Sequence, residues 1–242
     1  MPQKIEMVVF DMAGTTVKDE NEVEKCFSKA AIQTGLIATS ERINAMMGWS
    51  KRLVFETLWK EQLPGKPDNE IQELVNHSYT VFKEILENHY KASDIVPTLG
   101  CLELFAILKE KNIKISLTTG FYRHVTDIIL DRLGWNKGLN LNYTGNDLIN
   151  ASVSSDQVFV GRPAPFMVFK AMELCCVYDV RKIIKIGDTP SDLAEGKNAG
   201  CLYSLGITNG THTKAQLSKC ENDGLLDDLI HFRDFLEMIL KE

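Results

Sequence analysis

The amino-acid sequence predicts an α/β protein whose core is a doubly wound parallel sheet, with a helical cap inserted after the first strand. Short apolar runs alternate with helical patterns after residue 97, which is typical of strand–helix–strand units. The first run, Met7–Phe10, is apolar without interruption, as in a central strand covered on both faces. Residues 17–96 show only helical periodicity. We therefore predict a Rossmann-like core formed by residues 1–16 and 97–242 and a cap domain formed by residues 17–96.

The composition is that of an ordinary globular protein. The chain has 242 residues, of which 44% are hydrophobic and 25% charged, so it can bury a core of its own. The net charge of −6 comes without a basic cluster, which argues against nucleic acid as a partner. No apolar run approaches the ~18 residues of a membrane span and no signal peptide is recognisable, so no membrane partner is expected. Six cysteines without metal-ligand or disulfide spacing indicate a reduced, cytoplasmic protein.

The cap helices are predicted from apolar residues spaced three and four positions apart, with charged residues between them. Gly35, Gly48 and the Pro-Gly-Lys-Pro segment at 64–67 interrupt this pattern and mark helix ends. The expected cap helices cover residues 20–35, 40–47, 51–62 and 68–90.

The core elements alternate between helix and strand, which favours a parallel sheet with right-handed connections. Residues 140–160 show no clear pattern, and the mixed acidic and apolar segment 225–240 is expected to close the core. Core helices are expected at residues 101–111, 122–133, 163–175 and 191–199, and further strands at 113–117, 182–186 and 202–205.

Polar residues mark the ligand-facing ends of the core segments at Asp11, Thr119, Arg162 and Asp188. Because parallel strands all end at one edge of a sheet, we expect these four residues to share a pocket. The Asp11 and Asp188 carboxylates suit Mg²⁺, and the Thr119 hydroxyl, loop amides and Arg162 guanidinium suit phosphate oxygens. This combination predicts a phosphoryl-transfer site. Taken alone, Asp11 is equally well explained as a capping residue at an ordinary strand end.

Four segments resemble, in order, the motifs of the haloacid-dehalogenase-like hydrolases, and within them most closely those of the phosphonatases and phosphonatase-like hydrolases. A single motif of this kind is weak, but four in order with a helical insertion after the first are specific. The four segments are Phe10–Thr16 (FDMAGTT), Thr118–Gly120 (TTG), Gly161–Pro165 (GRPAP) and Gly187–Asp192 (GDTPSD).

This resemblance implies a set of roles for the strand-end residues. Asp11 would attack phosphorus and form an aspartyl-phosphate. A Mg²⁺ ion would be held by Asp11, the Ala13 carbonyl and Asp188, with Asp192 orienting a metal-bound water. The cap would close over the core and exclude bulk water. Catalytic roles are implied for Asp11, Lys51, Thr119 and Arg162, and substrate or phosphate contacts for Ala13, Met47, Gly120 and Arg162.

Within this superfamily, Ala13 and Lys51 resemble the corresponding residues of the phosphonatases. Most phosphatases of the superfamily carry a second aspartate, as acid and base, at the position of Ala13, and alanine cannot transfer protons. Phosphonatases resemble this chain in having that alanine. They use a cap lysine in a Met-Gly-x-x-Lys pattern, matched here by Met47–Lys51, to form an imine with an aldehyde substrate. Without this context, Lys51 is more simply explained as a surface lysine that opens a helix.

The chain differs from that family at Val54, where a cap histidine is usual, at Asn21, where a cysteine is usual, and at Phe121, where a tyrosine is usual. The resemblance implies phosphonoacetaldehyde as substrate, and these differences favour a related small phosphonate or a phosphate ester. The alternatives are a small-molecule phosphate-ester phosphatase and a non-catalytic phosphometabolite-binding protein. The resemblance also allows a homodimer through the cap.

Overall fold

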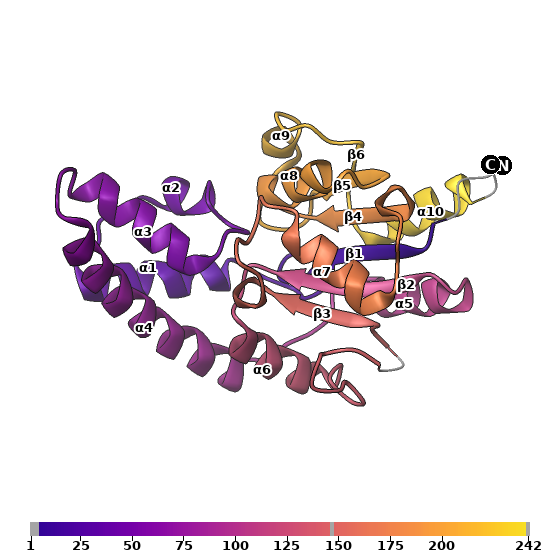
Figure 1. The fold of residues 1–242 in the computed structure, drawn as a ribbon, viewed down its shortest axis with the longest axis horizontal. Helices are drawn as coiled ribbons and strands as arrows, with labels where there is room; N and C mark the ends of the chain where they lie inside the picture. The colour runs from indigo at the N-terminus through magenta and orange to yellow at the C-terminus, as the bar shows by residue number, and fades with distance from the viewer. Residues whose placement is uncertain (1–4, 146–147, 241–242) are drawn as a thin grey trace.

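The computed structural model describes residues 5–145 and 148–240. Residues 1–4, 146–147 and 241–242 lie outside the described residues. The expected outer limits of the core, residues 1 and 242, are among them. The described chain forms one six-stranded sheet with helices on both faces and a separate group of helices at one end (Figure 1). No helix within the described ranges is both long and apolar enough to cross a membrane.

The sheet is parallel throughout, with the strand order β3-β2-β1-β4-β5-β6. Strand β1 lies in the middle, as its unbroken apolar sequence predicts, and pairs with β2 on one side and β4 on the other. The chain order reverses at β1, which is where doubly wound sheets place their ligands. The strands are β1 (Met7–Asp11), β2 (Lys114–Thr119), β3 (Ala151–Ser154), β4 (Ile183–Gly187), β5 (Tyr203–Ile207) and β6 (Gly224–Leu226).

Alternate residues of β1 face two different helical layers. On one face, the ring centroid of Phe10 lies 5.4 Å from that of Phe105 and 6.0 Å from that of Phe232, in helices α5 and α10. On the other face, Met7 and Val9 pack in a second cluster with α7 and the end of α8. The core helices are α5 (Cys101–Glu110), α6 (Arg123–Leu133), α7 (Phe166–Cys175), α8 (Pro190–Ala199), α9 (Lys214–Leu217) and α10 (Leu229–Ile239), with 3₁₀ turns at Ser155–Gln157 and Val180–Lys182.

The helical insertion between β1 and α5 has its own aromatic centre. Phe27 stacks on Phe55 with ring centroids 4.1 Å apart, and Phe82 closes the cluster from a third helix. These side chains come from helices distant in sequence, so the insertion buries apolar surface without the sheet. The insertion helices are α1 (Glu22–Thr34), α2 (Ser40–Asn44), α3 (Lys51–Gln62) and α4 (Asp68–Ala92).

Three parts of the structure differ from the expected elements. Helix α2 ends at Asn44, and a series of turns through Gly48, where φ is +84°, carries Met47 back toward Lys51. Strands β3 and β6 lie in segments with no clear strand pattern. In β3 the reason is visible: Ser152 and Ser154 are buried yet polar, so the segment lacks an apolar run although every residue in it is covered.

Candidate active site

The ends of the central strands bring the predicted residues to one edge of the sheet. Asp11 closes β1 and Thr119 closes β2, which are neighbouring strands in register. Asp188 follows β4 on the other side of β1. Asp11 and Asp188 are buried, and both lie at the carboxyl ends of strands and outside the apolar core. These three residues therefore meet at one edge, but of the four residues expected to share a pocket only Asp11 and Thr119 line the cavity at this edge.

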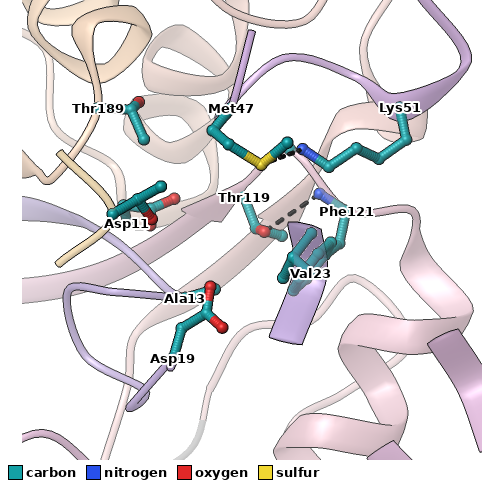
Figure 2. Close-up of a pocket in the computed structure, with 12 residues that line it drawn as sticks. Asp11, Ala13, Asp19, Val23, Met47, Lys51, Thr119, Phe121 and Thr189 are labelled. Atoms are coloured by element: carbon teal, nitrogen blue, oxygen red, sulfur yellow. Dashed lines mark hydrogen bonds between the residues drawn. The ribbon is translucent and has the colours of Figure 1, made fainter. Parts of the chain in front are cut away.

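A cavity lies over these strand ends, between the sheet and the insertion (Figure 2). The space free of protein atoms, open solvent included, is about 340 Å³. Residues of the sheet edge and of the insertion both line it. The lining consists of Asp11, Ala13, Asp19, Val23, Met47, Gly48, Lys51, Thr119, Gly120, Phe121, Thr189 and Thr211.

Arg162 lies behind Asp11 and is not part of the cavity lining. Its guanidinium donates to Asp11 at 2.6 Å, to Glu195 at 2.9 Å and to the Thr118 hydroxyl at 2.7 Å, and also lies 2.9 Å from Asp192. Each of its three nitrogens has a protein acceptor, and the side chain is fully buried. The structure thus places Arg162 where it holds Asp11, whereas the sequence had suggested a phosphate contact.

Two cations contact the same oxygen of Asp192. Its carboxylate lies 2.6 Å from the Lys185 amine and 2.9 Å from Arg162, and its second oxygen accepts from the Thr189 hydroxyl at 2.6 Å. Burial alone would raise the pKa of Asp192, but the charges of Arg162 and Lys185 outweigh it and lower that pKa. Asp192 is therefore an anion whose oxygens are already bound, which fits a role of orienting its neighbours.

Asp188 is fixed by two hydrogen bonds from different loops. It accepts from the Thr15 hydroxyl at 3.1 Å and from the Thr211 backbone N–H at 2.6 Å. Burial is the main cause that raises its pKa, followed by the charge of Asp192. Gly14, with φ of +89°, passes so close that a Cβ there would lie 2.3 Å from a carboxylate oxygen of Asp188. Only glycine fits at that approach.

The acidic residues fit a hard divalent cation. Asp11, Asp188 and Asp192 can each offer one oxygen such that all three oxygens lie within 4.8 Å of one another, and all three residues are buried. Burial, followed by the charge of Asp192, raises the pKa of Asp11 to about 7. Asp11 and Asp188 resist ionisation beside the Asp192 anion, a bound cation would relieve this crowding, and oxygen ligands suit Mg²⁺.

Lys51 reaches the same cavity from the insertion. It is the first residue of α3, and its side chain is only 4% exposed. Its amine lies 3.8 Å from the Met47 sulfur (Figure 2). It also lies 3.4 Å from the Trp49 carbonyl oxygen, and neither of these atoms is charged. Burial lowers the pKa of Lys51 from its ordinary value of 10.5 to about 8. The simpler explanation of Lys51 as a surface residue does not hold.

The insertion is closed over the strand ends at a loop with little free space. The Ser191 hydroxyl donates to the Met47 carbonyl at 3.2 Å. A Cβ on Gly120 would lie 2.6 Å from the Gly48 carbonyl oxygen, and a Cβ on Gly48 would lie 2.1 Å from the Ser191 hydroxyl oxygen. On the opposite side, the Tyr122 hydroxyl donates to Glu87 of α4 at 2.7 Å. The cavity is therefore shielded by contacts that hold only when insertion and sheet lie together.

Sequence reasoning missed three charged residues of this region. Lys185 and Glu195 support Arg162 and Asp192, with the Lys185 amine 3.5 Å from Glu195. Asp19, in the loop before α1, lines the cavity. Lys185 had a usable signal, because a lysine within the apolar strand Ile183–Gly187 needs a buried partner. Asp19 follows no strand directly, so the strand-end rule could not identify it.

Comparison with known proteins gives this site its family context. The family model described as "haloacid dehalogenase-like hydrolase" matches residues 5–200, which covers the sheet edge, the insertion and all of the acidic residues above. The chain belongs to the haloacid dehalogenase-like hydrolases. It is accordingly a hydrolase, and its sheet edge carries a cluster of three buried aspartates.

Two relatives within the haloacid dehalogenase-like hydrolases carry the same name. The chain is 34% identical over 252 residues to "Phosphonoacetaldehyde hydrolase" of Bacillus mycoides (strain KBAB4), covering 98% of this chain and 87% of the relative. It is also 34% identical to the protein of that name from Bacillus cereus (strain G9842), with the same coverage. The sequence resemblance to phosphonatase-like hydrolases is thus confirmed.

Solved structures agree on the fold. A hydrolase from Pseudomonas syringae superposes with a TM-score of 0.77 at 20% identity and covers 97% of this chain and 99% of its own. A "phoshonoacetaldehyde hydrolase like protein" from Oleispira antarctica superposes with a TM-score of 0.77 at 18% identity, covering 99% of this chain and 93% of its own. At these identities the likeness extends to the fold alone.

Proposed function

We propose that this protein hydrolyses the carbon–phosphorus bond of a small carbonyl-bearing phosphonate, phosphonoacetaldehyde or a close relative, with Mg²⁺ as cofactor. The observation that carries the proposal is Lys51, a buried amine with a pKa near 8, in the same cavity as Asp11. An imine-forming enzyme needs such an amine in its neutral form, whereas in an ester phosphatase the lysine would only steer the anionic substrate. The relatives named phosphonoacetaldehyde hydrolase support the same substrate class.

In this reaction the Lys51 amine condenses with the substrate carbonyl and expels water. Asp11 then attacks phosphorus as the carbon–phosphorus bond breaks, and the bond's electron pair moves into the iminium to give an enamine. Water hydrolyses the aspartyl-phosphate, and the enamine is protonated and hydrolysed, which frees the aldehyde and Lys51. Ala13 offers no acid for an alkoxide leaving group, and this reaction has none.

The remaining residues position these groups. We assign Arg162 to hold the Asp11 carboxylate, and Thr119 with the amides around Gly120 to bind the phosphoryl oxygens. Met47 would lie against the substrate carbon, beside the Lys51 amine.

The metal would be held by Asp11, Asp188 and the Ala13 carbonyl, with Asp192 supporting it. Bound there, Mg²⁺ would neutralise charge between the carboxylates and the phosphoryl group. The closed insertion, which we propose acts as the cap formed by residues 17–96, would keep bulk water from the imine.

The test is a phosphate-release screen of phosphonates and phosphate esters with Mg²⁺, run with and without borohydride. We expect turnover of phosphonoacetaldehyde and irreversible loss of activity when borohydride is added with the aldehyde, with the adduct found at Lys51 by mass spectrometry. Lys51→Arg should be inactive although it keeps the charge, because a guanidinium does not form the imine. Lys60→Arg, an exposed lysine of the same helix, is the matched control.

A phosphate-ester phosphatase predicts the opposite pattern. Esters would be hydrolysed, Lys51→Arg would keep most activity, and no adduct would form. A protein that only binds phosphometabolites would show neither turnover nor any effect of Asp11→Asn on catalysis. Either result would replace the proposal.

We also propose that the protein is a cytoplasmic homodimer associating through the insertion, where Ile32 is 79% and Ile37 is 81% exposed. Light scattering should give twice the mass of one chain. Ile37→Glu should lower it to that of a monomer.

A further inference from the structure

The cavity contains one ionisable side chain to which the proposed reaction gives no role. Of the residues that line it, only Asp11, Asp19 and Lys51 can exchange protons between pH 5 and 9. Asp11 is needed as nucleophile and Lys51 as the imine-forming amine, and neither can also serve as the proton donor. Ala13 is not an acid. Asp19 therefore remains as the cavity's own source of protons.

The Asp19 carboxyl is held in a fixed position at the start of α1. One of its oxygens accepts from the Glu22 backbone N–H at 2.8 Å. Asn21, at the helix cap position, has φ of +67° and makes no side-chain cap, so Asp19 supplies the missing acceptor. Figure 2 shows the side chain beside Ala13, across the cavity from Lys51 and Met47. Asp19 thus lines the same cavity as Asp11 and Lys51.

The surroundings favour the neutral acid. Burial, and next the hydrogen bond with the Glu22 side chain, raise the pKa of Asp19 to about 8. At neutral pH the carboxyl can then donate a proton, and the carboxylate left behind is basic enough to take one back. Besides its two contacts with Glu22, the carboxyl lines the cavity.

We propose that Asp19 is the general acid and base for imine chemistry at Lys51. Addition of the amine to the substrate carbonyl gives a neutral carbinolamine. The Asp19 carboxylic acid, directly or through one water, gives its proton to the carbinolamine hydroxyl. The carbon–oxygen bond breaks, water leaves, and an iminium and the Asp19 carboxylate remain, so charge and atoms balance. Carbon–phosphorus cleavage leaves an enamine, and a proton from solvent on its carbon restores the iminium. Water then adds to the iminium and gives its proton to the Asp19 carboxylate, which re-forms the acid.

This inference rests on the proposed function, because it requires an imine at Lys51. It is tested apart from phosphoryl transfer by following the first step alone. Acetaldehyde, which has a carbonyl and no phosphorus, is mixed with the enzyme and cyanoborohydride, and the adduct at Lys51 is followed by intact mass. Asp19→Asn keeps the acceptor for the Glu22 N–H and removes the proton. We expect the rate of adduct formation to fall about a hundredfold, with the same final extent.

Two further variants separate chemistry from structure. Added formate should restore part of the rate in Asp19→Ala, because a small acid can enter the space left by the side chain. Asp228→Asn is the matched control. Asp228 caps α10 by accepting from the Ile230 and His231 N–H groups, and it does not line the cavity. This substitution should leave the rate of adduct formation unchanged.

The outcomes are distinguishable. If wild type forms the adduct and Asp19→Asn forms it equally fast, Asp19 is a helix cap only, and the phosphonatase proposal stands. If wild type forms no adduct at Lys51 with either acetaldehyde or phosphonoacetaldehyde, the imine itself is wrong, and both proposals are overturned. A hundredfold loss that formate relieves supports both.

Discussion

At the residue scale, the site depends on how burial and charge act on single ionisable groups. Asp11 is 5% exposed and accepts a 2.6 Å hydrogen bond from Arg162, yet burial and Asp192 still raise its pKa to about 7. Its carboxylate is thus less stabilised than one at the surface, which suits a nucleophile that must leave its hydrogen bonds to attack phosphorus. Lys51 is shifted in the opposite sense by the same cause, because burial disfavours its cation.

We expect Asp11→Asn to lose at least about a thousandfold in kcat, several kcal/mol in barrier height, because the amide is a poor nucleophile and a weaker metal ligand. The fold should persist, since the amide oxygen can still accept from Arg162. Steady-state kinetics measures the first effect and circular dichroism the second. Activity within tenfold of wild type would remove Asp11 from the mechanism.

We expect the Lys51 amine to become reactive as the pH rises through about 8, well below its ordinary value of 10.5. The sign follows from the cause: burial penalises the protonated form, so the proton is lost at lower pH. Competitive labelling with acetic anhydride, read by mass spectrometry, should show half-maximal labelling of Lys51 near pH 8. The labelling of surface lysines should still be increasing above pH 9. Labelling of Lys51 that follows the surface lysines would contradict the buried amine.

At the element scale, β4 and α8 carry a buried ionic network that supports the nucleophile. Lys185, in the middle of β4, pairs with Asp192 at 2.6 Å and lies 3.5 Å from Glu195, both in α8. All three side chains are essentially inaccessible to solvent. Such a network contributes orientation more than net stability, but removal of one member leaves the others as unpaired buried charges.

We therefore expect Lys185→Met to lower the free energy of unfolding by about 3–5 kcal/mol, as measured by urea denaturation. Lys182→Met is the matched control, because Lys182 forms a part-exposed pair with Glu6 at 2.8 Å, and such pairs contribute about 1 kcal/mol or less. Equal effects of the two substitutions would show that the network is not needed to balance the buried charge.

The loop 46–50 of the insertion is the second element on which the site depends. A Cβ on Gly120 would lie 2.6 Å from the Gly48 carbonyl oxygen and 2.9 Å from the Trp49 carbonyl oxygen, so Gly120→Ala would push this loop away from the sheet. We expect kcat to fall by about tenfold to a hundredfold, because Lys51 follows this loop, with little change in the urea midpoint. Gly161→Ala is the control, since its Cβ would meet nothing closer than 3.6 Å. A wild-type kcat in Gly120→Ala would show that closure of the loop is not required.

At the scale of the whole molecule, the acidic edge of the sheet and the insertion depend on each other. The sheet gathers three buried carboxylates whose oxygens lie within 4.8 Å, an arrangement that opposes folding unless cations balance it. Arg162 and Lys185 supply part of that balance from within the chain. A bound divalent cation would supply the rest.

We expect EDTA to abolish activity and Mg²⁺ to restore it, and Mg²⁺ to raise the melting temperature of the whole protein. Saturation at about a hundredfold over Kd corresponds to about 2.7 kcal/mol of added stability. Asp188→Asn should lose the Mg²⁺-dependent shift in melting temperature, and Asp228→Asn should keep it. Full activity after exhaustive chelation, with no shift on adding Mg²⁺, would remove the metal from the proposal.

The sequence by itself determined the α/β class, the central place of β1, the helical insertion and the superfamily, because hydrophobic periodicity reports which segments are buried and motifs report strand ends. It also pointed to Asp11, Asp188 and Lys51. Only the tertiary structure decided what each side chain faces. The Arg162 guanidinium donates to Asp11, and the Lys185 amine pairs with Asp192 and Glu195.

The structure alone also revealed Asp19 in the cavity and the short strands β3 and β6. The physical reason is common to these cases. Periodicity gives the burial of a residue but not its partner, and a partner is fixed only when distant segments return to the same edge of the sheet. Asp19 lies opposite Lys51 because the start of α1 and the start of α3 are folded over one strand end, which no local pattern encodes.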